Sequence, residues 1–221
     1  TQICQSTAPF IYSDDLADGN RIIYKTRCKQ WSCKYCAKVN KYQHWLRTVK
    51  GVKHLADKGQ KFDFVTLTSH ESVKGTLATY KVWQSAWKKL STRFRRTYSE
   101  ITHLPVAFVY VPELHEDGRI HIHGLFSGHI SERWWKDNSR SCGLGYMSKC
   151  IPMVDPVKGA NYTLKYISKQ MGQDIAIERF RRINYSRTFP SLSRDKQEAS
   201  WRIWTNIQTI DLLVEHAWSL D

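Results

Sequence analysis

Glu113-Leu-His-Glu-Asp-Gly-Arg-Ile-His-Ile-His-Gly-Leu-Phe-Ser-Gly128 is the stretch that decides the fold of this chain. Within it, His121 and His123 alternate with isoleucines, which is the two-residue period of a half-buried β-strand. Side chains at that period project from one face of the strand, about 7 Å apart along the backbone. This spacing suits two imidazole ligands of one metal ion.

The apolar run 106–111 predicts a second strand, which ends at Glu113 and is joined to the first by a turn. A two-residue turn would pair Glu113 with Ile122 and direct the carboxylate away from the histidines. A three-residue loop over 116–118, with its glycine left-handed, pairs Glu113 with His121 instead. Three-residue hairpins with a glycine at that position are common. We therefore predict two imidazoles and one carboxylate on one face of a hairpin.

The composition points to a polyanionic partner. The 221 residues carry 34 Lys and Arg against 20 Asp and Glu, a formal net charge of +14. Such a field attracts nucleic acid, and the 13% of aromatic residues offers stacking platforms for unpaired bases. There is no apolar run of membrane-spanning length and no signal-peptide pattern at the N-terminus. We expect no membrane contact and a cytoplasmic location.

Three cysteines near the N-terminus have the spacing of zinc ligands. Cys33 and Cys36 form a C-x2-C pair, and Cys28 precedes them by five residues. Such a set is typical of a structural zinc site, with Cys4 predicted as the fourth ligand and His44 as an alternative. Free thiols, or a site completed by another chain, are the other interpretations.

The remaining pattern predicts alternating helices and strands. We expect an irregular arm over residues 1–20 and strands over 21–26, 62–69 and 146–154. Helices are predicted over 38–58, 74–96, from 131 and from 156, and in the tail around 201–213. The helix over 74–96 combines an aromatic stripe with cations on its outer side. Six of these cations are predicted to contact DNA phosphates: Lys81, Lys88, Lys89, Arg93, Arg95 and Arg96.

The helix that follows Asp155-Pro156 carries a doubled motif, Tyr162-x-x-Lys165-Tyr166-x-x-Lys169. At 100° per residue, these two tyrosines and two lysines share one side of the helix. A tyrosine that attacks a phosphodiester needs a cation to polarise the phosphate and a positive charge to favour phenolate, because the free phenol has a pKa of about 10. The lysines can supply that charge, and the predicted metal site can polarise the phosphate.

Together with the strand Phe64-Val-Thr-Leu-Thr68, these motifs resemble the HUH endonucleases, and more narrowly the rolling-circle replication initiators of single-stranded DNA phages and related plasmids. The resemblance covers about residues 60–172. It implies an α+β fold, in which helices flank an antiparallel, ferredoxin-like sheet of about five strands with the histidine strand central. It also implies Mg²⁺ or Mn²⁺ at Glu113, His121 and His123, with Tyr162 and Tyr166 as nucleophiles assisted by Lys165 and Lys169.

The expected domains are a cysteine-rich arm and helix (1–58), the endonuclease core (59–172) and a basic helical extension (173–221). The expected activity is site-specific nicking and rejoining of single-stranded DNA at an origin hairpin, through a 5′-phosphotyrosine intermediate, in a prokaryotic host cell. The chain has no Walker-type phosphate loop, so a host helicase must unwind the duplex and a host polymerase must extend it.

Three other functions fit parts of the sequence. A non-catalytic, zinc-stabilised single-stranded DNA-binding protein needs only the charge, the aromatic residues and the cysteines. An iron-dependent oxygenase would use two histidines and a carboxylate, but it leaves the Tyr/Lys motif unexplained. A two-histidine phosphoesterase would rest on His70-Glu-Ser72 and His129-Ile-Ser131, and it leaves His121 and His123 without a role.

Overall fold

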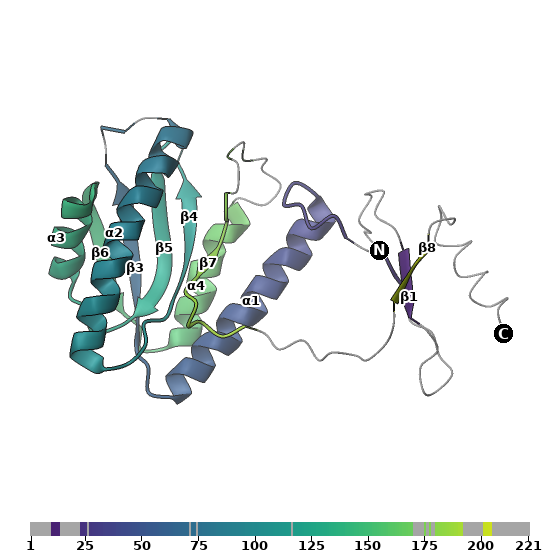
Figure 1. The fold of residues 1–221 in the computed structure, drawn as a ribbon, viewed down its shortest axis with the longest axis horizontal. Helices are drawn as coiled ribbons and strands as arrows, with labels where there is room; N and C mark the ends of the chain where they lie inside the picture. Colours follow the sequence, from purple (N-terminus) through teal and green to yellow (C-terminus); the bar gives the residue numbers. More distant parts are fainter. Residues whose placement is uncertain are drawn as a thin grey trace. The chain divides into compact units, whose positions relative to one another are not determined.

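The computed structural model describes residues 10–13, 23–25, 27–70, 72–73, 75–115, 117–169, 175, 177, 180–191 and 201–204. The chain divides into two compact units, one made of residues 1–37 and 193–221 and the other of residues 38–192. The larger unit contains the five-stranded sheet and most of the helices (Figure 1). No helix among these residues is long and apolar enough to cross a membrane.

A five-stranded antiparallel sheet forms the centre of the larger unit, with the strand order β6-β3-β5-β4-β7. The histidine strand β5 (Ile120–Ser127) is central, between β3 (Phe62–Ser69) and β4 (Phe108–Leu114). The outer strands are β6 (Leu144–Pro152) and β7 (Asn184–Tyr185). The predicted α+β fold with a central histidine strand is therefore confirmed.

One face of the sheet packs against α2 (Thr76–Thr102) and α3 (Glu132–Cys142). The aromatic stripe of α2 is buried there as predicted, and Phe94, Phe126 and Trp135 stack in the core. The helix runs past its predicted end at Arg96, because the fully buried Tyr98 extends the apolar stripe by one more turn. Ser131 caps α3 as predicted and accepts a hydrogen bond from the backbone N–H of Trp134.

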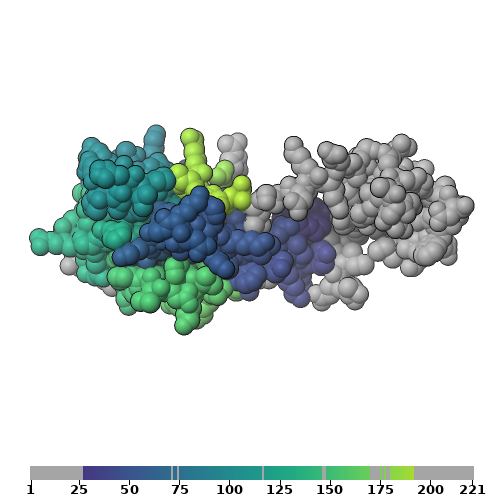
Figure 2. All heavy atoms as spheres, turned by 90° about the horizontal axis from the view of Figure 1, so that it is seen from below, coloured from purple at the N-terminus to yellow at the C-terminus, as the bar shows by residue number. Residues whose placement is uncertain are grey.

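The opposite face carries α4 (Pro156–Lys169), which contacts β3, β4 and β5. The side chain of Asp155 caps this helix and accepts hydrogen bonds from the backbone N–H groups of Val157 and Lys158. The stripe predicted to face the sheet is buried over Ala160, Leu164 and Ile167, while Met171 lies outside the described residues. In the edge-on view, α2 in teal and α4 in green lie on opposite sides of the fold (Figure 2).

Helix α1 (Lys34–Asp57) begins four residues before its predicted start. Trp45 Nε1 donates to Asn161 Oδ1 of α4 at 2.7 Å, and Thr48 lies 3.0 Å from the hydroxyl of Tyr185 in β7. These contacts join α1 to α4 and to the edge of the sheet.

The smaller unit contains a three-stranded antiparallel sheet of β1 (Phe10–Ser13), β2 (Ile23–Lys25) and β8 (Trp201–Trp204), in the order β2-β1-β8. The helix predicted around 201–213 is wrong over residues 201–204, which form a strand paired with β1, and residues 205–213 lie outside the described part. Tryptophan and isoleucine favour strands, and pairing with a distant segment outweighs a local helical pattern. The arm over 1–20, expected to be irregular, contains β1.

Candidate active site

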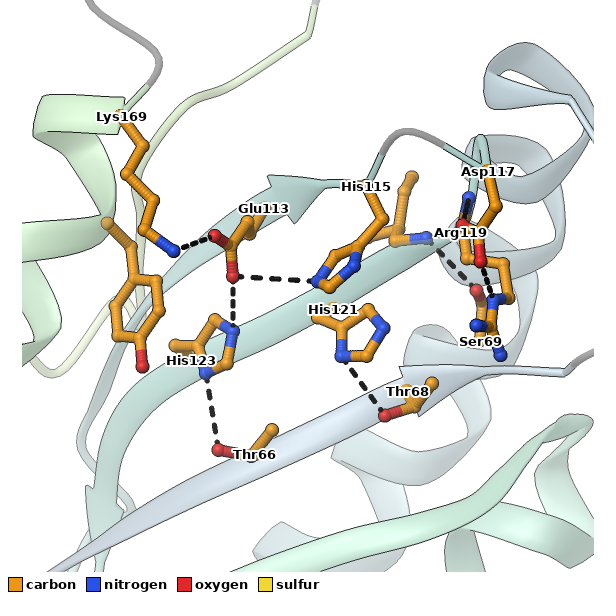
Figure 3. A network of polar contacts seen from close by, with 12 residues as sticks. Thr66, Thr68, Ser69, Glu113, His115, Asp117, Arg119, His121, His123 and Lys169 are labelled. Atoms are coloured by element: carbon orange, nitrogen blue, oxygen red, sulfur yellow. Dashed lines mark hydrogen bonds and ion pairs between the residues drawn. The ribbon is translucent and has the colours of Figure 1, made fainter.

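The hairpin that joins β4 and β5 has the predicted register, with Glu113 opposite His121 (Figure 3). The backbone N–H of His115 bonds the carbonyl of Arg119 at 2.9 Å, so three residues lie between the closing pair. Gly118 has φ 78°, the left-handed conformation that this loop requires. The three-residue loop is confirmed, and the side chains of Glu113, His121 and His123 share one face.

Strand β3 orients both imidazoles. His123 Nδ1 lies 3.2 Å from the hydroxyl of Thr66, and His121 Nδ1 lies 3.4 Å from the hydroxyl of Thr68. When Nδ1–H donates to a threonine oxygen, the Nε2 lone pair is left for a metal ion. His123 Nε2 lies 2.8 Å from Glu113 Oε2, whereas His121 Nε2 is buried and has no hydrogen-bond partner within the described part of the chain.

The electrostatics keep these groups in their ligating forms at neutral pH. Burial lowers the pKa of His121 to about 4, and it also lowers the pKa of His123. Burial alone would raise the pKa of Glu113, but the hydrogen bond from Lys169 and the proximity of His123 outweigh it and lower this pKa. Two neutral imidazoles and one carboxylate suit a divalent cation.

The three side chains therefore fit a metal ion by chemistry and by the unpartnered nitrogen of His121. Their ligand atoms are less convergent than those of the cysteines. Among the described residues, the trio Cys28, Cys33 and Cys36 is the group whose ligand atoms all lie within 4.8 Å of one another. Binding of an ion by Glu113, His121 and His123 thus requires side-chain rotation.

Helix α4 brings its tyrosines to the histidine strand. The ring of Tyr166 stacks on His123, with centroids 3.7 Å apart and planes 6° from parallel. The hydroxyl of Tyr166 donates to that of Tyr162 at 3.3 Å, and the ring of Tyr162 packs edge-on against Phe64 at 4.9 Å. Both phenol oxygens thus occupy one place beside the histidines.

The two lysines of the motif differ in their contacts. Lys169 Nζ donates to Glu113 Oε1 at 2.5 Å and lies 5.1 Å from the ring centroid of Tyr166. Lys165 Nζ lies 6.0 Å from the ring centroid of Tyr162. Burial, together with the hydrogen bond to Tyr162, raises the pKa of Tyr166. The phenol is therefore neutral until a further positive charge arrives.

Sequence reasoning missed one residue of this cluster. The ring of His115 stacks on His121 with centroids 3.8 Å apart, and its Nε2 lies 3.8 Å from Glu113 Oε2. The signal was present, because His115 follows Glu113 by two residues, as His123 follows His121. The same two-residue period places His115 on the face of the site.

The cysteine prediction is supported for three ligands. The sulfur atoms of Cys28 and Cys36 are 3.5 Å apart, and with Cys33 they form a group that could hold a metal ion. Cys4 lies outside the described residues. The alternative ligand His44 does not belong to this group, and its Nδ1 lies 3.3 Å from the hydroxyl of Tyr185.

The basic residues predicted to contact DNA lie on α2, across the sheet from the tyrosines. Five of them are exposed and Arg93 is half-buried, where it donates to Asn138 and Ser141 of α3. An open groove of about 650 Å³ lies along this helix, lined by Lys88, Lys89, Arg93 and Arg96 together with Ser85 and Thr92. The sheet separates this surface from the tyrosine site.

A family model described as Replication-associated protein ORF2 matches residues 63–171. The match spans β3, α2, β4, β5, α3, β6 and α4, and it includes the histidine strand and both tyrosines. No curated protein and no solved structure matches the chain. The family match implies DNA binding and a role in the initiation of rolling-circle replication. Residues 63–171 belong to this family of phage replication-associated proteins, as the sequence motifs predicted.

Proposed function

We propose that this protein nicks and rejoins single-stranded DNA at a replication origin, with a tyrosine as the nucleophile. The observation that carries the proposal is the stacking of Tyr166 on His123, 3.7 Å apart, with Lys169 bonded to Glu113. Three motifs that are distant in the sequence meet there: the tyrosine helix, the histidine strand and the acidic end of β4.

Glu113, His121 and His123 would hold Mg²⁺ or Mn²⁺, which supplies positive charge to polarise the scissile phosphate. The threonine hydroxyls of β3 orient the imidazoles for this role. Lys165 and Lys169 add positive charge beside the phenols, which favours phenolate over phenol and stabilises the charge on the phosphate in the transition state.

In the cleavage step, the phenol of Tyr162 or Tyr166 loses its proton and its oxygen bonds to phosphorus. The bond between phosphorus and the 3′ oxygen breaks, and the leaving 3′ oxygen takes up a proton. The products are a 5′-phosphotyrosine and a free 3′-OH. The phosphodiester energy is conserved in the tyrosine ester, so attack by a 3′-OH rejoins the strand without ATP.

Two tyrosines with hydroxyls 3.3 Å apart suit successive strand transfers. Once one phenol carries the strand, the other lies within reach of the same place on the protein. Tyr162 is 49% exposed, while Tyr166 is half-buried against His123. Tyr162 is therefore the more accessible nucleophile, and Tyr166 the one closer to the histidines.

The outer face of α2 would bind a different part of the DNA from the tyrosine site. Lys88, Lys89 and Arg96 are exposed on this face. Within the described residues, the acidic contact of these three is an exposed one at 4.0 Å between Arg96 and Glu100. Such pairs are weak, so the cations remain available to phosphates.

The test incubates the protein and Mn²⁺ with a random single-stranded oligonucleotide library, labelled in separate reactions at the 5′ and the 3′ end. Denaturing gels and intact-mass measurements detect a covalent adduct, and sequencing of the cut ends gives the recognised site. We expect an adduct at Tyr162 or Tyr166, a free 3′-OH on the released strand and inhibition by EDTA.

The variant that changes both Tyr162 and Tyr166 to Phe should form no adduct and should bind DNA with nearly unchanged affinity. Tyr42→Phe is the matched control, because Tyr42 is 59% exposed on α1 and contacts Trp45 rather than the histidines. Binding without any adduct in the wild-type protein, on single strands and on hairpins, would refute the proposal. That result would favour a non-catalytic, zinc-stabilised single-stranded DNA-binding protein.

A further inference from the structure

A pocket of about 390 Å³ lies beside the tyrosines, between β6 and α4. Its walls come from three elements: Phe64 from β3, Ile151 and Lys149 from β6, and Lys158 and Tyr162 from α4. Met153, which follows β6, completes the lining on this side. Its described lining includes none of the predicted metal ligands, so it is a neighbouring site rather than the metal site itself.

The pocket combines an apolar interior with a cationic edge. Phe64 and Tyr162 meet edge to face there, and Ile151 is 38% exposed, which is unusual for a large aliphatic side chain. Lys149 and Lys158 are both exposed beside it. Among the described residues, no acidic side chain lines the pocket. Apolar and aromatic walls bordered by cations are the chemistry that binds an unpaired base and its phosphates.

The depth of the pocket depends on a close approach between α4 and the sheet. A Cβ added to Gly159 would lie 2.7 Å from Met153 Sδ and 2.8 Å from Leu125 Cδ2. Glycine at this position therefore lets the tyrosine helix lie directly on the sheet. The same approach brings the pocket and the hydroxyls of Tyr162 and Tyr166 together on one helix.

We propose that this pocket holds the base of an unpaired nucleotide immediately next to the phosphate that the tyrosines attack, with Lys149 and Lys158 on the flanking phosphates. The inference rests on the proposed function, since that function places a phosphate at the tyrosine hydroxyls. The volume is in the range of pockets that hold small ligands, and one base with part of its sugar fits within it.

The lining also determines what the pocket distinguishes. Its hydroxyl from Thr66 already contacts His123 Nδ1, so few polar atoms remain to read the hydrogen-bonding edge of a base. The pocket therefore recognises the presence and stacking of a base rather than its identity. An abasic nucleotide at this position should bind and react poorly, whereas purines and pyrimidines should be exchanged with small effect.

The first test is photocrosslinking with a random single-stranded library in which 5-iododeoxyuridine replaces thymidine. After irradiation and trypsin digestion, crosslinks should concentrate in the peptides of residues 62–74 and 150–158, which carry Phe64 and Met153. Ile151→Asp should reduce these crosslinks about tenfold, the loss expected when one stacked base is displaced. Ile101→Asp is the control, because Ile101 is exposed on α2.

This measurement needs neither a metal ion nor cleavage, so its outcome is independent of the nicking assay. Where an adduct forms, abasic substitution along the cut strand should identify one position beside the cut whose base is required. That requirement should disappear in Ile151→Asp. If crosslinks in the two peptides are absent, or unchanged by Ile151→Asp, the pocket proposal is wrong, and normal adduct formation in the same protein would leave the nicking proposal intact.

Discussion

Replacing Gly159 with alanine tests whether close packing of α4 on the sheet positions the tyrosines. Two effects on stability oppose each other. Alanine in place of glycine inside a helix stabilises by about 0.5–1 kcal/mol. Against this, the new methyl would lie 2.7 Å from Met153 Sδ and 2.8 Å from Leu125 Cδ2. Overpacking of this kind costs about 1–3 kcal/mol.

The two neighbours differ in how easily they move. Met153 is a flexible, half-buried side chain, and its sulfur can rotate away at small cost. Leu125 is fully buried under α4 and has little free space. We therefore expect a net loss of about 1 kcal/mol in the free energy of unfolding, together with a shift of α4 by several tenths of an ångström. Nicking should fall by more than stability, because misplacement of about 1 Å in a reacting group can cost about 100-fold in rate.

Urea unfolding followed by tryptophan fluorescence gives the stability, and the rate of adduct formation gives the activity. Gly51→Ala is the matched control, since its Cβ would lie 2.4 Å from Phe189 Cε1, between α1 and the segment after β7. It should also lose stability, while its nicking rate stays close to the wild-type value. If Gly159→Ala is instead more stable by the full helix propensity, or if both variants lose activity equally, the reasoning fails.

Three further predictions concern the charge, the metal site and the histidines. Neutralising four α2 cations should reduce the slope of log K against log salt for single-stranded DNA by up to about 3, at about 0.7 per phosphate contact; the substitutions are Lys88→Gln, Lys89→Gln, Arg93→Gln and Arg96→Gln. An equal change on exposed lysines elsewhere should alter the slope less, and an equal effect would contradict the assignment; these are Lys50→Gln, Lys53→Gln, Lys58→Gln and Lys61→Gln. Elemental analysis should find one zinc per chain, lost in Cys33→Ser and kept in Cys150→Ser, because burial raises the pKa of the Cys150 thiol to about 12 and keeps it protonated; retention of zinc in Cys33→Ser would exclude the site. Burial, with the charge of Arg47, lowers the pKa of His44 to about 4, so the unfolded chain binds more protons between about pH 6.5 and 4 and the protein loses stability as the pH falls through that window. His44→Gln should flatten this loss by up to about 3 kcal/mol in urea unfolding at a series of pH values, and an unchanged pH profile would contradict it.

The parts of the site that could be predicted from sequence are those set by local periodicity. The two-residue period fixes the face of His121 and His123, and the turn chemistry of Gly118 fixes Glu113 opposite His121. The Asp155-Pro156 pair marks the start of α4 within one residue. These features depend on backbone geometry over a few residues, so one sequence was sufficient.

Features that depend on distant packing were missed. The stacking of Tyr166 on His123 and the contact of Lys169 with Glu113 require α4 to lie on one particular part of the sheet, which no local pattern determines. The strand over 201–204 forms by pairing with residues near the N-terminus, so its local helical pattern was misleading. The end of α2 moved by six residues because Tyr98 finds a buried place in the core.

The loop at Gly118 connects these two levels, because its length determines what α4 can meet. A hairpin shorter by one residue would pair Glu113 with Ile122 and turn its carboxylate to the face that packs against α2. Ile122 is fully buried on that face, and an unpaired carboxylate there would be strongly destabilising. With three residues in the loop, Glu113 instead faces α4, where Lys169 and His123 both bond to it. The register of one hairpin therefore allows the acidic group, the imidazoles and the tyrosine helix to form a single site.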